Sequence, residues 1–303
     1  MPRTFGLIGA PSSVGAHWPG QEKAPGCLRA AGLVEELTGA GLDVVDMGDL
    51  PVVRFAPHPV ERRPHNLSAV VQFARDLAGR VQTVLRAGHL PLVIGGDCSI
   101  TVGVLSAFLH KQENLALLYM DGGVDLYTPE TEPPGILDSM GVAHMLGEPG
   151  TAEAFSRIGP RFPLLSPGSI VFFAPDMQST QQPERAVCER HQMAVYPAAR
   201  VHGSAGRLSA QALADVEGRG EQFLIHFDVD SIDFLDFPIS DVPLINAGIT
   251  FAEAMQSLSV FTASPKFAGL VITEFNPDHA DEKGVLAKRF VKGLANALSG
   301  ISA

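Results

Sequence analysis

Residues 115–125 read LALLYMDGGVD, an uninterrupted apolar run that ends in two aspartates spaced by small residues. A continuous apolar run of this length is typical of a strand buried on both faces, as in a parallel sheet. Similar runs leading to acidic residues occur at 90–97, 222–230 and 267–274, and further strand-like runs at 5–9, 43–47 and 169–173. Helix-length stretches separate them at 24–40, 67–87, 99–109, 208–217, 251–261 and 284–298. This alternation predicts βαβ units and a mostly parallel sheet with helices on both faces.

Composition narrows the class of protein. The 303 residues are 46% hydrophobic and 18% charged, which provides for a sizeable core and excludes a disordered chain. No repeat, low-complexity tract or linker divides the chain, so we expect one domain over 1–303. The net charge of −11 argues against a nucleic-acid partner, and no apolar run reaches the ~18–20 residues of a membrane helix. Three scattered cysteines predict no disulfide framework, and we expect a cytoplasmic protein.

Acidic residues gather where the expected strands end. Asp121 and Asp125 follow one strand, and alternation places His226, Asp228 and Asp230 on one face of another. An aspartate after a strand is often only a helix cap or a turn former. Four carboxylates at one edge of a sheet would nevertheless repel each other unless some hold protons or a cation sits among them. The pattern therefore indicates a divalent metal site, where imidazole or thiolate ligands extend the choice to manganese, iron or zinc.

Four motifs together resemble the ureohydrolase family of arginases and agmatinases. They are GGDCS at 95–99, DGGVD at 121–125, HFDVDSIDF at 226–234 and EFNP at 274–277. The family's own motifs are GGDHS, DAHxD, SxDxDxxDP and ExNP, and the resemblance extends over essentially the whole chain. It implies a three-layer α/β/α sandwich and a homotrimer or hexamer. It also implies a metal centre, with Mn²⁺ as the family's ion, that hydrolyses a carbon–nitrogen bond in a guanidino or amidine small molecule.

The departures from the family fall on the metal ligands. The resemblance places ligands at Cys98, Asp121, Asp125, Asp228 and Asp230, and it places Gly123 where the family has a second histidine. One metal site would keep four ligands, with thiolate in place of imidazole. The other would keep only carboxylates, two of them shared. We therefore expect one tightly bound divalent ion or none. His226 stands at the serine position of the third motif, where it is a ligand, a second-shell hydrogen-bond partner of a ligating aspartate, or a structural residue.

The resemblance also assigns contacts with a substrate. Glu274 would receive a guanidinium group, and Thr250 matches a family threonine near that group. The arginase loop that binds the amino acid or shuttles protons corresponds here to Tyr127, Pro134 and Asp138. An α-amino-acid clamp is not evident, so arginine is not the expected substrate. Asp138 is the expected acid or base, a role that requires a raised pKa near neutrality.

Two classes of function stay open. The protein is either a metal-dependent hydrolase of a guanidino or amidine compound other than arginine, or a catalytically inactive homologue with a binding, assembly or regulatory role. The acidic charge and the lost ligands fit the second class equally well. A third hypothesis makes Cys98 a nucleophile at a helix start. Four nearby carboxylates would oppose ionisation of the Cys98 thiol. His144 is expected to be a packed helix residue.

Overall fold

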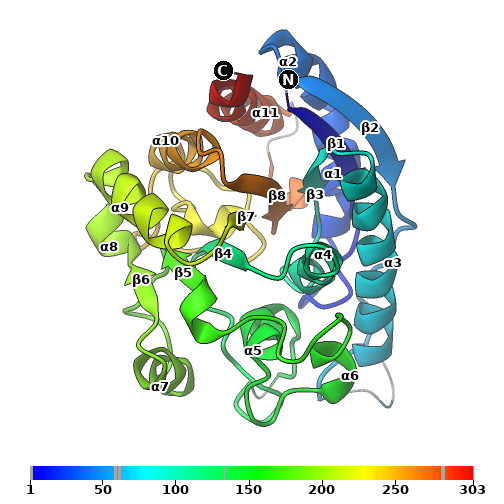
Figure 1. Ribbon diagram of the computed structural model, residues 1–303, viewed down its shortest axis with the longest axis vertical. Coiled ribbons are helices and arrows are strands. Elements are labelled where there is room, and N and C mark those ends of the chain that lie inside the picture. Colours follow the sequence, from blue (N-terminus) through cyan, green and yellow to red (C-terminus); the bar gives the residue numbers. More distant parts are fainter. Residues whose placement is uncertain (1–2, 58–59, 61–62, 133, 281–283, 303) are drawn as a thin grey trace.

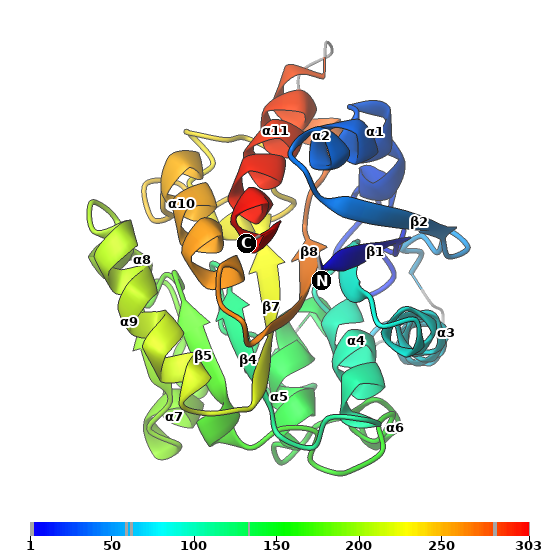
Figure 2. The same ribbon diagram turned by 45° about the horizontal axis from the view of Figure 1, so that its top comes forward.

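All eight strands of the described chain belong to one parallel sheet. The computed structural model describes residues 3–57, 60, 63–132, 134–280 and 284–302. The strand order is β2-β1-β3-β8-β7-β4-β5-β6 (Figures 1 and 2). Every neighbouring pair is parallel, which confirms the predicted sheet. The strands are β1 (Thr4–Gly9), β2 (Asp43–Asp49), β3 (Leu90–Ile94), β4 (Leu115–Met120), β5 (Ile170–Phe173), β6 (Ala194–Tyr196), β7 (Gln222–Asp228) and β8 (Phe267–Thr273).

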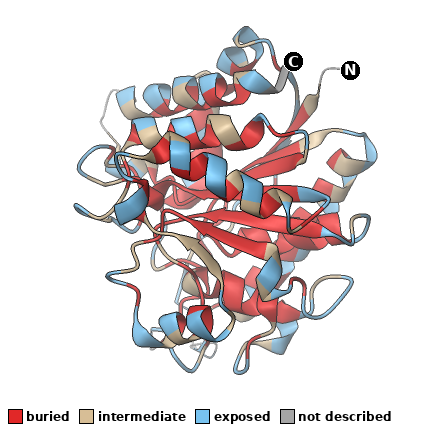
Figure 3. Ribbon diagram, turned by 60° about the vertical axis from the view of Figure 1, so that its left-hand side comes forward, coloured by how far each residue is buried: buried red, intermediate tan, exposed pale blue. Residues whose placement is uncertain are grey.

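Helices cover both faces of the sheet and bury one apolar cluster on each. Alternate β4 side chains enter opposite clusters, so the central strands are buried on both sides (Figure 3). One face holds α1 (Ala24–Ala30), α2 (Leu33–Gly39), α8 (Ala198–Val201), α9 (Ala205–Glu217), α10 (Phe251–Thr262) and α11 (Val285–Leu298). The other holds α3 (Leu67–Arg86), α4 (Ile100–Leu109), α5 (Gly141–Leu146), α6 (Glu153–Ser156) and α7 (Gln182–Arg190). This is the expected three-layer sandwich.

Sequence reasoning missed the short elements and joined two helices. The stretch 24–40 is not one helix, because Gly32 has a φ of 92° and ends the first helix in a left-handed conformation. β6 has only three residues, all half-buried at the edge of the sheet, and is too short to show a period. No helix in the described parts of the chain has both the length and the apolar composition needed to cross a membrane.

The four central strands bring the acidic motifs together. β3 and β4 are consecutive in sequence, but β8 and β7 lie between them in the sheet. Their last apolar residues lie in one row, since Ile94 and Phe227 both pair with Ile272, and Met120 pairs with Phe227. The four loops that follow therefore leave the same edge of the sheet, where open α/β folds bind their ligands.

His144 is a structural residue of α5, as expected. Its ring is fully buried, Nδ1 lies 2.8 Å from the carbonyl oxygen of Met140, and Nε2 accepts the backbone N–H of Ala152 at 3.0 Å. Both contacts fit the neutral imidazole with its proton on Nδ1. Burial lowers the pKa of His144 to about 4.

Acid should therefore weaken the fold through His144. The unfolded chain binds a proton at the ordinary pKa of ~6.5, whereas the folded chain does so only near pH 4, so stability is lost as the pH falls through this window. We expect His144 to remove about 2 kcal/mol from the free energy of unfolding between pH 7.5 and pH 5. Urea unfolding at both pH values should show a smaller loss in His144→Gln. Equal losses in the two proteins would contradict this.

Candidate functional site

A cavity of about 210 Å³ opens where the four central strands end. Seven carboxyl groups line it: Asp121, Asp125, Asp138, Glu184, Asp228, Asp230 and Glu274. Among the described residues that line it, His17 is the only basic side chain. So many carboxyl groups cannot all be ionised in a partly buried space without a cation among them. Protons on some of these groups, or a cation in the cavity, must therefore offset their charge.

The loop after β4 supplies two of these carboxyl groups. Asp121 follows the strand directly, and one of its oxygens accepts the backbone N–H of Gly123. Asp125 has a φ of 49°, a strained conformation for a residue with a side chain, and accepts a hydrogen bond from the hydroxyl of Tyr119. Burial, and then the charge of Asp121, raise the pKa of Asp125 well above its usual value. A Cβ at Gly123 would lie 3.3 Å and 3.4 Å from oxygens of Asp121 and Asp125, so the position has little room to spare.

The end of β7 supplies a second pair. Asp228 accepts the backbone N–H of Asp230 at 2.7 Å, and Asp230 accepts that of Gly122 at 2.9 Å, which ties this loop to the loop after β4. Burial, followed by the charges of Asp230 and Asp121, raises the pKa of Asp228 well above its ordinary value. The pKa of Asp230 rises to about 8 by burial and by the charge of Asp121.

Cys98 lies in the loop after β3, just before α4. Its sulfur is 2.7 Å from an oxygen of Asp228, and its backbone N–H donates to Asp138 at 2.6 Å. Burial, then the charges of Asp228 and Asp138, raise the pKa of the Cys98 thiol well above its usual value. Without a cation the thiol stays protonated, which argues against the hypothesis that Cys98 acts as a free nucleophile.

Glu274 follows β8 and reaches the same cavity. Its φ of 61° is strained, and the residue is only 1% exposed. Oε2 accepts a hydrogen bond from the side-chain amide of Gln21 at 3.1 Å, whereas Oε1 is buried with no partner in the described structure. Burial, then the charges of Asp138 and Asp228, raise the pKa of Glu274 well above its usual value. A buried acceptor left without a donor is costly unless a ligand supplies one.

The wider part of the cavity contains a residue that sequence reasoning missed. Glu184 lies on α7, accepts the backbone N–H of Leu126 at 3.1 Å, and has its pKa raised to about 7, mainly by burial. Tyr127, a predicted substrate contact, lines the same cavity, and burial and the charge of Glu184 raise its pKa to about 12. Nothing in the sequence singled out Glu184, because the polar α7 shows no apolar run and no acidic motif.

Thr250, which was expected near a substrate, and Pro134, which matches the substrate-contacting loop of the family, do not line the acidic cavity. Thr250 is the N-cap of α10, where its side chain and that of Glu253 form a reciprocal capping box. It lines a separate pocket of about 550 Å³, together with Asp233 and Asn246. Pro134 is exposed and does not line the acidic cavity. Thr250 matches the family threonine in sequence because the same type of side chain serves either as a helix cap or as a ligand contact.

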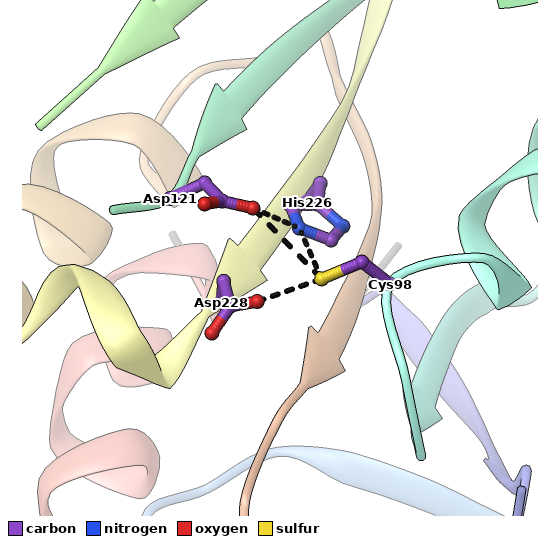
Figure 4. Close-up of side chains that lie close together, drawn as sticks. All are labelled: Cys98, Asp121, His226 and Asp228. Atoms are coloured by element: carbon purple, nitrogen blue, oxygen red, sulfur yellow. Dashed lines mark hydrogen bonds and ion pairs between the residues drawn. The ribbon is translucent and has the colours of Figure 1, made fainter. Parts of the chain in front are cut away.

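Four possible metal ligands converge at the cavity, three of which line it (Figure 4). One donor atom each of Cys98, Asp121, His226 and Asp228 lie within 4.8 Å of one another, and all four residues are buried. Burial lowers the pKa of His226, which keeps its ring neutral and able to coordinate. Cys98 forms a second such group with Asp138 and Glu274. Oxygen, nitrogen and sulfur donors in this number fit a divalent transition metal ion.

Comparison with known proteins agrees with this architecture. The chain is 27% identical to the arginase of Bacillus caldovelox over 91% of both chains, and 28% identical to arginase-1 of Homo sapiens over 91% of this chain and 85% of that one. The solved B. caldovelox arginase matches with a TM-score of 0.89, at 26% identity over 98% of each chain. The Bacillus subtilis formimidoylglutamase, at 20% identity, shares the fold with a TM-score of 0.75 over 99% of this chain and 87% of that one. The family model described as "Arginase family" matches residues 3–295, so the chain belongs to the arginase family.

Proposed function

We propose that the protein is a metal-dependent hydrolase that cleaves a carbon–nitrogen bond in a cationic guanidino or amidine small molecule other than arginine. The observation that supports this most is the cavity lined by seven carboxyl groups, with no lysine or arginine among its described lining residues. A metal ion and a cationic substrate are the two kinds of occupant that offset such a charge. Membership of the arginase family supports the same chemistry.

Cys98, Asp121 and Asp228 would hold the ion, with a fourth ligand from Asp125 or His226. Their donor atoms already lie close together, so binding requires little rearrangement. Mn²⁺ is the ion that the family resemblance implies. When bound, such an ion lowers the pKa of water to near neutrality and so supplies the nucleophile for hydrolysis. Asp230 would orient this centre through its contact with the backbone of Gly122.

Glu274 and Asp138 are the remaining catalytic residues of the proposal. The unpartnered oxygen of Glu274 would accept a hydrogen bond from a guanidinium or amidinium N–H, and Tyr127 would border the substrate farther out. Hydrolysis adds water to the central carbon and breaks one carbon–nitrogen bond, and the departing nitrogen needs a proton. Burial and neighbouring charges raise the pKa of Asp138 well above its usual value, so its carboxyl group holds a proton suited to this transfer.

A catalytically inactive homologue is the second candidate. Gly123 offers no side chain where the family resemblance places a histidine, and in the structure the Cys98 thiol donates to Asp228. A binding, assembly or regulatory role, within a homotrimer or hexamer, would tolerate both features. The metal content of protein purified without chelator separates the two candidates.

Arginine and agmatine should release no appreciable urea. The family loop that contacts the substrate is replaced by Tyr127 and by Pro134, which lies outside the cavity. A colorimetric urea assay with either substrate, with and without added Mn²⁺, checks this, and the B. caldovelox arginase serves as a positive control for arginine. Turnover in the ordinary enzymatic range of about 1–1,000 per second would contradict our interpretation of the loop.

Removing one carboxylate should stabilise the metal-free protein. In the presence of chelator, Asp228→Asn relieves repulsion with Asp121 and Asp230, and we expect the free energy of unfolding to rise by about 1–3 kcal/mol. The same change should weaken binding of added divalent ions. Asp43→Asn, at an exposed position on β2, is the matched control and should change neither property. A wild-type protein that melts identically with and without chelator and contains no metal would rule out the metal site.

Each chain should bind at most one ion tightly. A second ion would have only Asp121, Asp228 and Asp230 as ligands, two of them shared with the first ion, and Gly123 adds none. Elemental analysis should therefore give one metal per chain or fewer. The double variant Gly123→His with Cys98→His should raise the ratio towards two, since the oxygens that a Cβ at Gly123 would meet belong to side chains. Two ions per unmodified chain would refute this prediction.

A further inference from the structure

The donor atoms at the floor of the cavity differ in kind. Cys98 offers sulfur, His226 offers nitrogen, and Asp121 and Asp228 offer oxygen (Figure 4). Three of these residues line the cavity, whereas His226 approaches from beneath it, on β7. The proposed function leaves open whether Asp125 or His226 is the fourth ligand. The distances between the donor atoms, together with the hydrogen-bond partners of each side chain, distinguish Asp125 from His226 as the fourth ligand.

Three of the separations match those of a tetrahedral zinc site. Bond lengths of ~2.3 Å to sulfur and ~2.0 Å to nitrogen and oxygen imply tetrahedral edges of about 3.5 Å for both S–N and S–O and about 3.3 Å for N–O. The Cys98 sulfur lies 3.6 Å from Nε2 of His226 and 3.8 Å from Oδ2 of Asp121, and this nitrogen and oxygen are 3.2 Å apart. These atoms already surround a point where an ion of this geometry fits.

The fourth donor lies nearer. Oδ2 of Asp228 is 2.7 Å from the Cys98 sulfur, and the thiol donates its proton to that oxygen. A metal ion binds the thiolate, so this hydrogen bond disappears on binding. The two atoms then need to separate by only about 0.8 Å to reach the tetrahedral edge.

His226 is held as metal-ligating histidines are. The ring is completely buried, and Nδ1 lies 2.8 Å from the hydroxyl oxygen of Thr101 on α4. With the proton on Nδ1, the ring donates to Thr101 and leaves the Nε2 lone pair facing Cys98 and Asp121. Tyr119 stacks on the ring at 4.0 Å between centroids and 3° between planes, which fixes its orientation.

Tyr119 also holds Asp125 back. Its hydroxyl donates to Oδ2 of Asp125, and among the described residues Asp125 belongs to neither group of possible ligands within 4.8 Å. One side chain thus orients His226 towards the cluster and engages the carboxylate that the family resemblance would have used.

The geometry points to a mixed-donor site, formed by Cys98, Asp121, His226 and Asp228, that binds one zinc ion. The inference rests on the metal dependence of the proposed function and replaces Asp125 by His226. Thiolate and imidazole favour zinc over manganese, whose sites are richer in oxygen. Thr101 and Tyr119 are positioning residues for this ligand set.

Cobalt substitution tests the ligands without any activity assay. The chelator-treated protein is titrated with Co²⁺, and binding should produce a thiolate-to-cobalt charge-transfer band in the near ultraviolet that Zn²⁺ removes by displacement. Cys98→Ser should abolish the band. His226→Phe, which keeps a ring for Tyr119 to stack on, should weaken Zn²⁺ binding by about 100-fold or more, because even outer partners of a ligand contribute about 10–100-fold. Thr101→Val should weaken it by about 10–100-fold through His226.

Asp125→Asn is the control that separates the two ligand sets. Zinc affinity unchanged in Asp125→Asn and lowered in both His226→Phe and Thr101→Val would support the inference, and Thr101→Val covers the case in which His226→Phe does not fold. Zinc affinity lowered in Asp125→Asn and unchanged in His226→Phe and Thr101→Val would overturn the inference. The proposed function would then stand, with the ion at the site implied by family resemblance. Zinc binding by a protein that shows no thiolate-to-cobalt band with Co²⁺ would also overturn the inference. Displacement of Zn²⁺ by equimolar Mn²⁺ would do the same. Failure of the folded wild type to bind any ion would reject both proposals.

Discussion

Repulsion among buried carboxyl groups is the constraint on which the site depends. Seven acids border one small cavity, and burial raises the pKa of Asp125, Asp138, Glu184, Asp228, Asp230 and Glu274, so without a cation these groups favour their protonated forms. The free energy that burying these acids costs the folded state has to be offset by the rest of the molecule. The two apolar clusters on the faces of the sheet provide it, because the central strands are buried on both sides. Binding of the proposed cation would offset this repulsion.

The parallel sheet explains why these acids meet. β3 and β4 are consecutive in sequence, but β8 and β7 insert between them, so four loops from distant parts of the chain share one edge. The strained residues Asp125 and Glu274 lie at this edge, and no residue other than glycine within the eight described strands has a positive φ. Strained residues at a ligand-binding edge are held by their surroundings, which here means buried loops tied together by hydrogen bonds such as that from Gly122 to Asp230.

In the proposed site, divergence from the arginases would change the kind of metal ligands as well as their number. Cys98 replaces an imidazole with a thiol, and Gly123 removes the other imidazole. His226, in a strand position where the family motif has serine, restores a nitrogen donor from a different direction. Softer donors and fewer carboxylates shift the preference of a site from manganese towards zinc. The proposed ligand set would therefore take a different ion from the one that family resemblance implies.

The sequence by itself determined the layers of the fold and most of the acidic residues of the site. Apolar periodicity over long strands and helices is strong, and Asp121, Asp228 and Glu274 each follow such a strand directly. Only the tertiary structure decided the rest. Glu184 reaches the cavity from a polar helix, Thr250 is turned away into a helix cap, and Tyr119 engages Asp125 while orienting His226. Motif spacing along a chain specifies which backbone positions are near one another, but the direction of a side chain depends on partners that are distant in sequence.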